Sequence, residues 1–446
     1  MRLLLILFLL PLMVFSQQKI PEGTKLVELA NSQESFLEFV PENYDSNILW
    51  PAIFVFDPGG NAINGITPFL NSAREMGYLV FASNDAQNGK HTENFDIAGR
   101  MMNQAIASYS IDGSRMYVAG FSGGSRLASA IAVLSKQMAG VIACGSGFSP
   151  NVNEQPTNET FSYAGIVGNS DMNYAEMHAA HAWLDKFDVT NRLFLFEGGH
   201  RWPSPSTIKR AMVWLDMNKA KNLNEELLAT DRRYGDSLVS QENWLMAYKE
   251  FEAMRDGDPP SVQRQYAMDQ LTIIRQQAGL EESVRDEKQL LARENKMLNE
   301  LTDRYLGDLK KPNKSSLKWW EKRIAQLAES SGDLTPQAQQ SARLIRHIQA
   351  IALESGFVDQ NHKDSYQKAL FSARLLLLTD PESSYYHYLE IYAHEAAGQR
   401  KLALEQLESA FSKGQLNAKE FTKYRLHEKL KDDPQYQGLI ERYSAD

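Results

Sequence analysis

The sequence predicts two folds in tandem: a mostly parallel β-sheet with flanking helices, followed by an all-α domain that resembles helical repeats. The first observation is an uneven distribution of charge and glycine. Residues 1–220 contain 35 charged residues and 18 of the 27 glycines, whereas residues 221–446 contain 68 charged residues and 9 glycines. The second observation is that short apolar runs alternate with helix-period segments only in the first half. A glycine-rich half suits a sheet with tight turns, and a charge-rich half suits stacked helices.

Short apolar runs suit strands that are buried on both faces of a parallel sheet. We expect strands at 36–40, 52–56, 78–82, 116–119, 141–143, 163–167 and 193–196. We expect helices between them at 69–76, 95–109, 126–136, 174–187 and 206–218. Functional residues of such a sheet gather at the carboxyl ends of the strands, so the residues that follow each run are the candidates.

The first 18 residues have the pattern of a secretory signal. Arg2 precedes an apolar run from Leu3 to Leu10, and Ser16 stands before two glutamines. This is the basic, apolar and small-residue order of a cleaved signal peptide, and the apolar run is short for a bilayer span. We expect a signal peptide at 1–16, a periplasmic or secreted mature chain, and no membrane span after cleavage.

Composition argues against several kinds of partner and site. The net charge of −9 argues against a nucleic-acid partner, which would require a basic face. Cys144 is the single cysteine, so neither an intramolecular disulfide nor a cysteine-rich zinc site can form. His178 and His181 lie three residues apart on a predicted helix, but no third ligand stands at matching spacing. We expect no metal and no cofactor.

The strongest motif follows the fourth predicted strand. Gly120-Phe121-Ser122-Gly123-Gly124 has the G-x-S-x-G pattern and leads directly into a predicted helix. This context is that of a nucleophile elbow, in which a serine stands on a sharp turn and small neighbours let strand and helix approach closely. Ser122 is the candidate nucleophile, and a plain turn serine is the alternative.

Two further strand ends supply an acid and a base. Asp171 follows the predicted strand 163–167, and His200 stands in a Gly-Gly turn after the strand 193–196. An aspartate can orient an imidazole that takes the proton of a serine, and the chain order Ser, Asp, His is that of α/β hydrolases. The alternatives are a helix N-cap for Asp171 and a structural histidine for His200.

The negative oxygen that forms when a serine attacks a carbonyl needs two N–H donors. Gly123, next to the candidate nucleophile, is expected to supply one. The loop at 57–61, which reads DPGGN, is expected to supply the other. Because Pro58 has no N–H, Gly59 is the predicted donor and Gly60 is the reserve.

These motifs resemble those of a known family. The segment IDGSRMYVAGFSGG at 111–124 is similar to the approach to the elbow in the feruloyl esterase and polyhydroxybutyrate depolymerase branch of the α/β hydrolases. Residues 198–200 with Trp202 and Pro203 resemble the histidine loop of that branch. The resemblance covers about residues 35–218 and implies a secreted carboxylic-ester hydrolase with Ser122 as nucleophile, His200 as base and Asp171 as acid.

Two features bear on the substrate. Asp57-Pro58 replaces the His-Gly that usually precedes the oxyanion donor in that branch, so the oxyanion loop departs from the pattern. About ten residues separate Ser149 from the next predicted strand, which leaves little room for a lid. We therefore expect a site open to an aromatic or polymeric ester, unless the helical half covers it. Phe121, Phe148, Tyr174 and Trp202 are either pocket or core residues.

The second half, 221–446, is helical by period. We expect helices at 244–254, 263–277, 281–305 and 317–328. Ala369 and Ala403 are 34 residues apart, which is the tetratricopeptide period, and the segment around 366–415 resembles such a repeat. Repeats of this kind bind peptides or partner proteins, so a protein partner and an inert buttress are both open interpretations.

The sequence thus predicts an exported serine esterase in three parts: a signal peptide at 1–16, an α/β-hydrolase domain at 17–220 and a helical domain at 221–446. A peptidase or an acyltransferase would use the same three residues, and a non-catalytic exported binding protein is the alternative from another class. If His200 is the base, hydrolysis should slow as the imidazole becomes protonated. A flat profile from about pH 5 to 8 would contradict that role.

Overall fold

The structure, a computed structural model, describes residues 19–30, 32–89, 91–157, 160–219, 225–256, 261–329, 335–357 and 365–444. The predicted signal peptide lies outside the described residues. Contacts within the chain divide it into two compact units. One unit comprises Lys19–Ala292 with Leu334–Gln339, and the other comprises Arg293–Asp333 with Gln340–Asp446.

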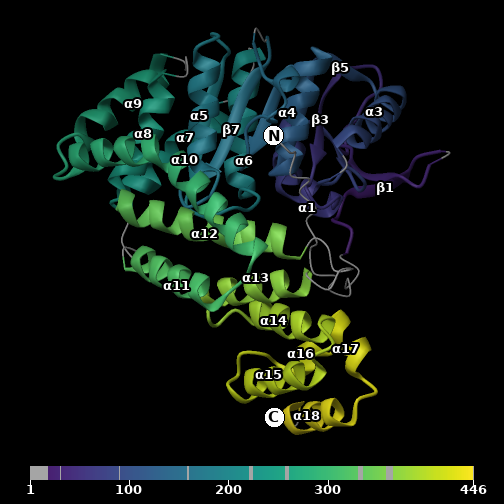
Figure 1. Cartoon of the computed structure of the whole chain (residues 1–446). Coiled ribbons are helices and arrows are strands. Elements are labelled where there is room, and N and C mark those ends of the chain that lie inside the picture. The colour runs from purple at the N-terminus through teal and green to yellow at the C-terminus, as the bar shows by residue number, and fades with distance from the viewer. Residues whose placement is uncertain are drawn as a thin grey trace. The chain divides into compact units, whose positions relative to one another are not determined.

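The first unit contains an eight-stranded sheet in the order β1-β2-β4-β3-β5-β6-β7-β8 (Figure 1). β1 pairs antiparallel with β2 and β2 pairs antiparallel with β4, whereas the pairs from β4 through β3 to β8 are parallel. The strands span Thr24–Glu28, Ser35–Phe39, Trp50–Phe56, Leu79–Ser83, Ile111–Phe121, Gly140–Cys144, Ser162–Gly168 and Asn191–Phe196. This confirms the predicted α/β-hydrolase fold class, with a mostly parallel sheet followed by an all-α region.

The central segments of the parallel strands are apolar because both faces of the sheet are covered. On β3, Phe54 and Phe56 join one hydrophobic core, while Ile53 and Val55 join the other. Successive side chains of a strand point to opposite faces, so a strand buried on both sides reads as a continuous apolar run. Seven of the eight strands were predictable for this reason.

Helices lie on both faces of the sheet. Residues of α3 (His91–Ser108), α4 (Gly123–Ser135) and α5 (Tyr174–Asp185) pack into one core, and residues of α1 (Ala62–Ile66), α2 (Leu70–Met76) and α6 (Pro205–Lys219) pack into the other. Short 3₁₀ turns at Thr67–Phe69 and Val152–Glu154 complete this part. The five helices expected from the sequence are present, whereas the short α1 was not predicted.

The strand β1 was missed because it lies at the edge of the sheet. Its pattern of exposure shows no residue fully buried, and Leu26 is 42% exposed. An edge strand that packs one weakly covered face carries little of the apolar signal that identifies buried strands.

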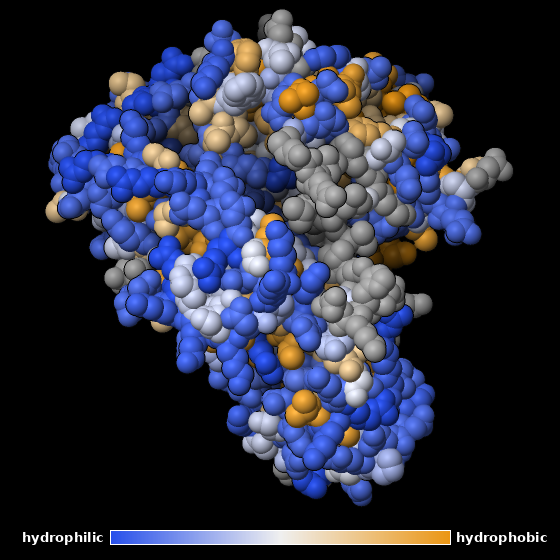
Figure 2. Space-filling view, viewed as in Figure 1, coloured by the Kyte–Doolittle hydropathy of each residue, from blue (hydrophilic) through white to orange (hydrophobic). Residues whose placement is uncertain are grey.

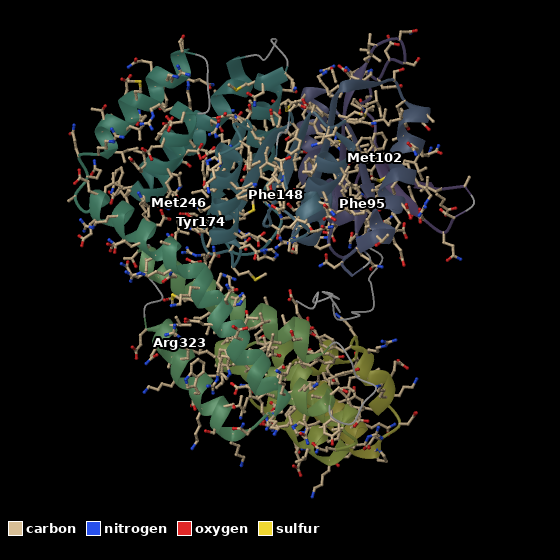
Figure 3. The ribbon with its side chains drawn as sticks, turned by 45° about the horizontal axis from the view of Figure 1, so that its top comes forward. Phe95, Met102, Phe148, Tyr174, Met246 and Arg323 are labelled. Atoms are coloured by element: carbon tan, nitrogen blue, oxygen red, sulfur yellow. The ribbon has the colours of Figure 1, made fainter. Side chains whose placement is uncertain are left out.

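Three helices after residue 220 belong to the same unit as the sheet. They are α7 (Glu225–Ser240), α8 (Trp244–Asp256) and α9 (Ser261–Ile274). Their buried residues extend the core that covers the α5 side of the sheet, where Met246 and Tyr174 are members of one cluster (Figure 3). The predicted boundary at 220 marks the change from α/β to all-α structure, and its role as a domain division stays a prediction.

Charged side chains fasten these helices to the sheet. Arg192 on β8 and Arg210 on α6 are buried, and both reach Asp231 on α7, at 2.6 and 2.8 Å. Both also pair with Glu250 on α8, with Arg192 at 2.7 Å. Two guanidiniums and two carboxylates thus neutralise one another inside the unit, which a buried charge requires.

The second unit is helical. It contains the end of α10 (Leu280–Lys310), α11 (Lys314–Ala328), most of α12 (Pro336–Gly356), and then α13 to α18 at Ser365–Thr379, Ser384–Ala396, Arg400–Ser412, Ala418–Phe421, Arg425–Leu430 and Pro434–Ser444. The four helices that the sequence predicts after residue 220 are present as α8 to α11, of which α8 and α9 lie in the first unit. α14 and α15 form a pair around a turn at Gly398, but the tetratricopeptide resemblance stays a prediction.

The second unit contains a buried ion pair. Arg343 and Glu294 pair at 2.6 Å inside the second unit, where both side chains are almost fully buried. Figure 2 shows a mainly hydrophilic face on which hydrophobic side chains are scattered. Within the described ranges, no helix is both long and apolar enough to cross a bilayer.

Candidate active site

Ser122 stands at the junction of β5 and α4 in a conformation that few non-glycine residues adopt. Its φ is 52° and its ψ is −120°, and its N–H donates to the Cys144 carbonyl at 2.8 Å. A Cβ on Gly120 would collide with the Gly124 carbonyl, and a Cβ on Gly124 would collide with the Phe56 carbonyl. The two glycines are therefore required for the close approach that the elbow needs.

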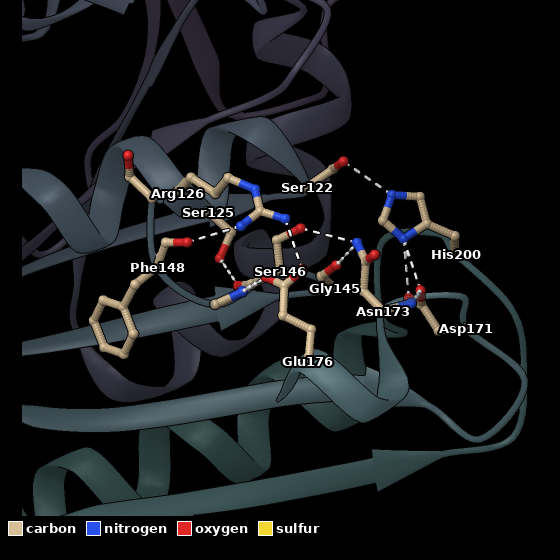
Figure 4. Close-up of polar contacts among 12 residues, drawn as sticks. Ser122, Ser125, Arg126, Gly145, Ser146, Phe148, Asp171, Asn173, Glu176 and His200 are labelled. Carbon is tan, nitrogen blue, oxygen red and sulfur yellow. Dashed lines mark hydrogen bonds and ion pairs between the residues drawn. The ribbon is translucent and has the colours of Figure 1, made fainter. Parts of the chain in front are cut away.

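The structure brings the three predicted side chains together (Figure 4). The hydroxyl of Ser122 lies 2.9 Å from Nε2 of His200. Nδ1 of His200 lies 3.0 Å from each carboxylate oxygen of Asp171. Asp171 is 1% exposed and Ser122 is 8% exposed, so water has little access to either. An Nδ1–H that donates to the carboxylate leaves Nε2 free to accept the serine proton.

Asp171 also accepts a backbone N–H, but it is not the N-cap of α5, because Asn173 occupies that position. The N–H of Asn173, just before α5, donates to its carboxylate at 2.8 Å. The side-chain amide of Asn173 donates in turn to the Gly145 carbonyl at 2.7 Å. Because Gly145 packs against His200, this amide links the loop after β6 to the histidine. Sequence reasoning did not identify Asn173, since its partners lie on another loop.

A second link holds the same loop to the elbow helix (Figure 4). Arg126 on α4 donates to the Phe148 carbonyl at 2.8 Å and pairs with Glu176 on α5, also at 2.8 Å. Glu176 accepts the N–H of Gly147 at 2.9 Å. The helix that follows the nucleophile is thus tied to the helix that follows the acid.

The loop at 57–61 is organised by a buried carboxylate. Asp57 accepts the N–H of Gly59 at 2.9 Å and the indole N–H of Trp202 at 2.8 Å, and it also accepts the N–H of Asn61. Burial raises the pKa of the Asp57 carboxyl above its usual value, and these three donors act against that shift. The departure from His-Gly therefore has a structural role, because Asp57 joins this loop to the histidine loop through Trp202.

The predicted donor Gly59 is consequently placed with its N–H directed at Asp57. Gly123 is placed as the first residue of α4, directly after Ser122. The N–H of a first helical residue has no partner within its helix, so it is available to a ligand.

The aromatic candidates divide into two groups. Phe121 lies over His200 with ring centroids 4.6 Å apart, and Trp202 lies 5.6 Å from Phe121. Phe121 thus covers one side of the imidazole, and Trp202 packs against Phe121. Phe148 and Tyr174 are instead buried members of the sheet core.

A cavity of about 480 Å³ lies beside the histidine loop. Its walls come from that loop, from the start of α6 and from α7, and they include Arg201, Trp202, Thr207, Tyr234 and Ser237. The cavity is therefore bounded by residues that directly follow His200 in the chain.

Cys144 and His181, which the sequence also singled out, are packed within the fold. Cys144 is fully buried on β6, and burial raises the pKa of its thiol far above the usual value. His181 bonds through Nδ1 to the Asn191 side chain, and burial lowers its pKa. In the part of the chain that the structure describes, no three side chains of His, Cys, Asp or Glu are grouped to hold a metal ion.

The sheet and the site together define an α/β-hydrolase fold in which a serine is hydrogen-bonded to a histidine and that histidine to an aspartate. No protein-family profile and no curated protein sequence matches the chain.

Among solved structures, S-formylglutathione hydrolase (FrmB) from Staphylococcus aureus is similar at 13% identity, over 44% of this chain and 99% of that one, with a TM-score of 0.35. A ferulic acid esterase is similar at 14% identity, over 40% and 90%, with a TM-score of 0.33. The acylaminoacyl peptidase of Pyrococcus horikoshii is similar at 14% identity, over 45% and 42%, with a TM-score of 0.35. The assignment of chemistry therefore rests on the geometry of this chain.

Proposed function

We propose that this protein is an exported serine hydrolase that cleaves carboxylic esters through an acyl-enzyme intermediate. The observation that carries the proposal is the continuous chain of hydrogen bonds from Ser122 to His200 to Asp171, with donor–acceptor distances of 2.9 and 3.0 Å. A serine is a weak nucleophile until an adjacent base takes its proton, and this arrangement supplies that base and orients it.

The proposed reaction has two halves. Ser122 Oγ bonds to the ester carbonyl carbon while its proton passes to Nε2 of His200, and Asp171 stabilises the resulting imidazolium. The tetrahedral intermediate then expels the alcohol, which takes the proton from Nε2. Water attacks the acyl-enzyme with the same proton transfers, which releases the acid and restores Ser122.

The first experiment is covalent labelling of the purified mature chain with a fluorophosphonate, with Ser122→Ala as the matched variant. We expect labelling of the wild type and none of the variant. The same two proteins are then compared on short-chain aryl esters. A folded wild-type protein that neither labels nor hydrolyses would reject the proposal and favour a non-catalytic binding protein.

The acyl acceptor and the leaving group are the finer part of the proposal. A parallel assay with matched aryl esters and aryl amides, and with an added alcohol as competing acceptor, separates an esterase from a peptidase and from an acyltransferase. We expect the ester to be cleaved faster than the amide and water to be the main acceptor. Preference for the amide or for the alcohol would replace the esterase assignment.

Export and a partner of the helical half are proposals as well. Mass spectrometry of the N-terminus of the protein recovered outside the cytoplasm should find a chain that begins after Ser16. A chain that retains Met1–Gln18 would contradict cleavage there. Affinity capture on an immobilised fragment of residues 293–446 tests whether the helical half binds a protein. Circular dichroism of the fragment before immobilisation checks that it is folded.

A further inference from the structure

In the loop that was expected to complete the oxyanion site, the N–H groups of residues 59–61 already have partners. Gly59 donates to the carboxylate of Asp57 at 2.9 Å, and Gly60 donates to the Asp57 carbonyl at 3.1 Å. Asn61 also donates to the carboxylate, and Pro58 has no N–H. An oxyanion donor must point at the reacting oxygen before the reaction begins. The second donor must therefore come from elsewhere.

Asn88 lies against the first donor. A Cβ on Gly123 would collide with Oδ1 of Asn88, and Nδ2 of Asn88 lies 3.2 Å from the same point. The side-chain amide of Asn88 thus touches the residue that directly follows Ser122. A side chain at position 123 would displace that amide.

The backbone at Asn88 is fixed by its neighbours. Its N–H donates to the Pro58 carbonyl at 2.9 Å, and Gly59 forms a bridge with Gln87. The buried side chain of Asn94 accepts the Gln87 N–H at 3.1 Å and donates to the Gln87 carbonyl at 2.8 Å. The β4–α3 loop that carries Asn88 is therefore held to the Asp57 loop and to α3.

The backbone N–H of Asn88 is hydrogen-bonded, but its side-chain amide has no such partner in the described part of the chain. The side chain is half-buried, and among the described residues neither Nδ2 nor Oδ1 has a hydrogen-bond partner. A half-turn about the terminal torsion exchanges the two atoms, and that torsion is soft in asparagine. The amide can therefore direct an N–H toward an oxygen that also receives the Gly123 N–H.

We propose that the side-chain amide of Asn88 is the second oxyanion donor of this enzyme, a catalytic role that rests on the proposed ester hydrolysis. When Ser122 Oγ bonds to the carbonyl carbon, the carbonyl π electrons move to oxygen. The N–H of Gly123 and an Nδ2–H of Asn88 receive that charge. No proton is transferred to the oxygen, and the electron pair re-forms the C=O bond as the alkoxide leaves with the proton of His200.

The test measures kcat and KM for a short-chain aryl ester in Asn88→Ala and Asn88→Asp, with Gln104→Ala as the control for loss of an exposed amide in the same unit. Loss of one side-chain donor of this kind costs about 10²–10³ in kcat. We expect such a fall in Asn88→Ala with little change in KM, and a fall at least as large in Asn88→Asp, because a carboxylate would repel the oxyanion. Gln104→Ala should resemble the wild type.

A second readout separates catalysis from support of the fold. An aryl trifluoromethyl ketone forms a tetrahedral adduct with an active serine, so its inhibition constant should weaken in Asn88→Ala by about the factor lost in kcat/KM. Melting temperatures should be unchanged. Retention of kcat within about threefold, or a rise in KM alone, would overturn the role of Asn88. Absence of activity and labelling in the wild type would instead reject the proposed function.

Discussion

Asp57 shows how one side chain can organise two loops of the site. Its carboxylate receives the N–H of Gly59, the N–H of Asn61 and the indole N–H of Trp202. It thereby fixes the turn after β3 and the position of Trp202, two residues beyond His200.

Asp57→Asn should reduce stability because an amide has one acceptor oxygen and turns its NH₂ group toward N–H donors. Hydrogen bonds to a charged acceptor contribute about 1.5–3 kcal/mol, so we expect a loss of that size in the free energy of unfolding. Urea unfolding at neutral pH measures it, and Asp96→Asn, an exposed carboxylate on α3, is the control. Equal unfolding midpoints for the two variants would show that the Asp57 contacts add nothing to the stability.

The site residues differ in how far the sequence can reveal them. Ser122, Asp171 and His200 were predictable because each follows an apolar run, and parallel strands end at one edge of the sheet. Their catalytic roles stay a prediction. Asn88 and Asn173 were not predictable, since each acts on a loop distant in sequence, and only the folded chain shows that the Gly59 N–H is already used.

At the scale of elements, α7 forms one wall of the cavity beside the histidine loop. Ser237 lines this cavity, whereas Ser240, one turn further along α7, is exposed and does not. Ser237→Trp should therefore fill the cavity, and Ser240→Trp should leave it open. If part of the substrate enters there, Ser237→Trp raises KM for bulky aryl esters severalfold and leaves acetate esters unchanged.

Both variants add the same ring to the same helix, so a difference in KM between Ser237→Trp and Ser240→Trp reports on the cavity alone. An equal effect of the two substitutions, or an effect of Ser237→Trp on acetate esters alone, would contradict the assignment of the cavity to the substrate. Steady-state kinetics with a series of acyl lengths makes the measurement.

The helix α12 carries a histidine whose burial makes stability depend on pH. Nε2 of His347 lies 2.8 Å from the Thr302 hydroxyl and 3.1 Å from the Leu298 carbonyl, and burial lowers its pKa although that carbonyl raises it. Burial lowers the pKa of His181 on α5 in the same way. Below the usual histidine pKa of 6.5, the unfolded chain takes up protons that the folded chain resists.

Stability should therefore fall as the pH drops from about 7.5 to 5.5. In His347→Gln and His181→Asn, which keep a polar group but cannot be protonated, the fall should be smaller. Urea midpoints at the two pH values measure the effect. A slope that is identical in the wild type and both variants would contradict it.

At the scale of the whole molecule, the sheet depends on helices that sequence reasoning assigned to another domain. Arg192 and Arg210 are buried and find their carboxylates on α7 and α8, at Asp231 and Glu250. Removing one side of a buried ion pair costs about 3–5 kcal/mol, since an uncompensated charge remains. The paired guanidiniums also lower the pKa of Asp231, so this support persists until strongly acidic pH.

A fragment of residues 19–220 should consequently fail to fold, whereas a fragment of residues 19–292 should fold. Circular dichroism, thermal unfolding and fluorophosphonate labelling of Ser122 compare the two. Soluble 19–220 protein with a cooperative transition and with labelling equal to that of the longer fragment would show that the ion pairs are dispensable.

The sequence predicted the class of each half but not how the halves share residues. Apolar runs reveal buried strands, and period reveals helices. The helix α7 was missed because EELLATDRRYGDSLVS is polar and contains Gly235, and its buried Asp231 reads as a surface residue. Its partner Arg192 is 39 residues away, so the pairing that buries it exists only in three dimensions.

The same ion pairs order events in time as the chain is made. A ribosome that has reached residue 220 has produced every strand and the elbow, yet the carboxylates of Asp231 and Glu250 have not been synthesised. The nascent chain then holds Arg192 on β8 and Arg210 on α6 without the carboxylates that neutralise them. We therefore expect the last strand to stay undocked until roughly thirty further residues have been made. Docking of the last strand should therefore follow, rather than accompany, the synthesis of the sheet.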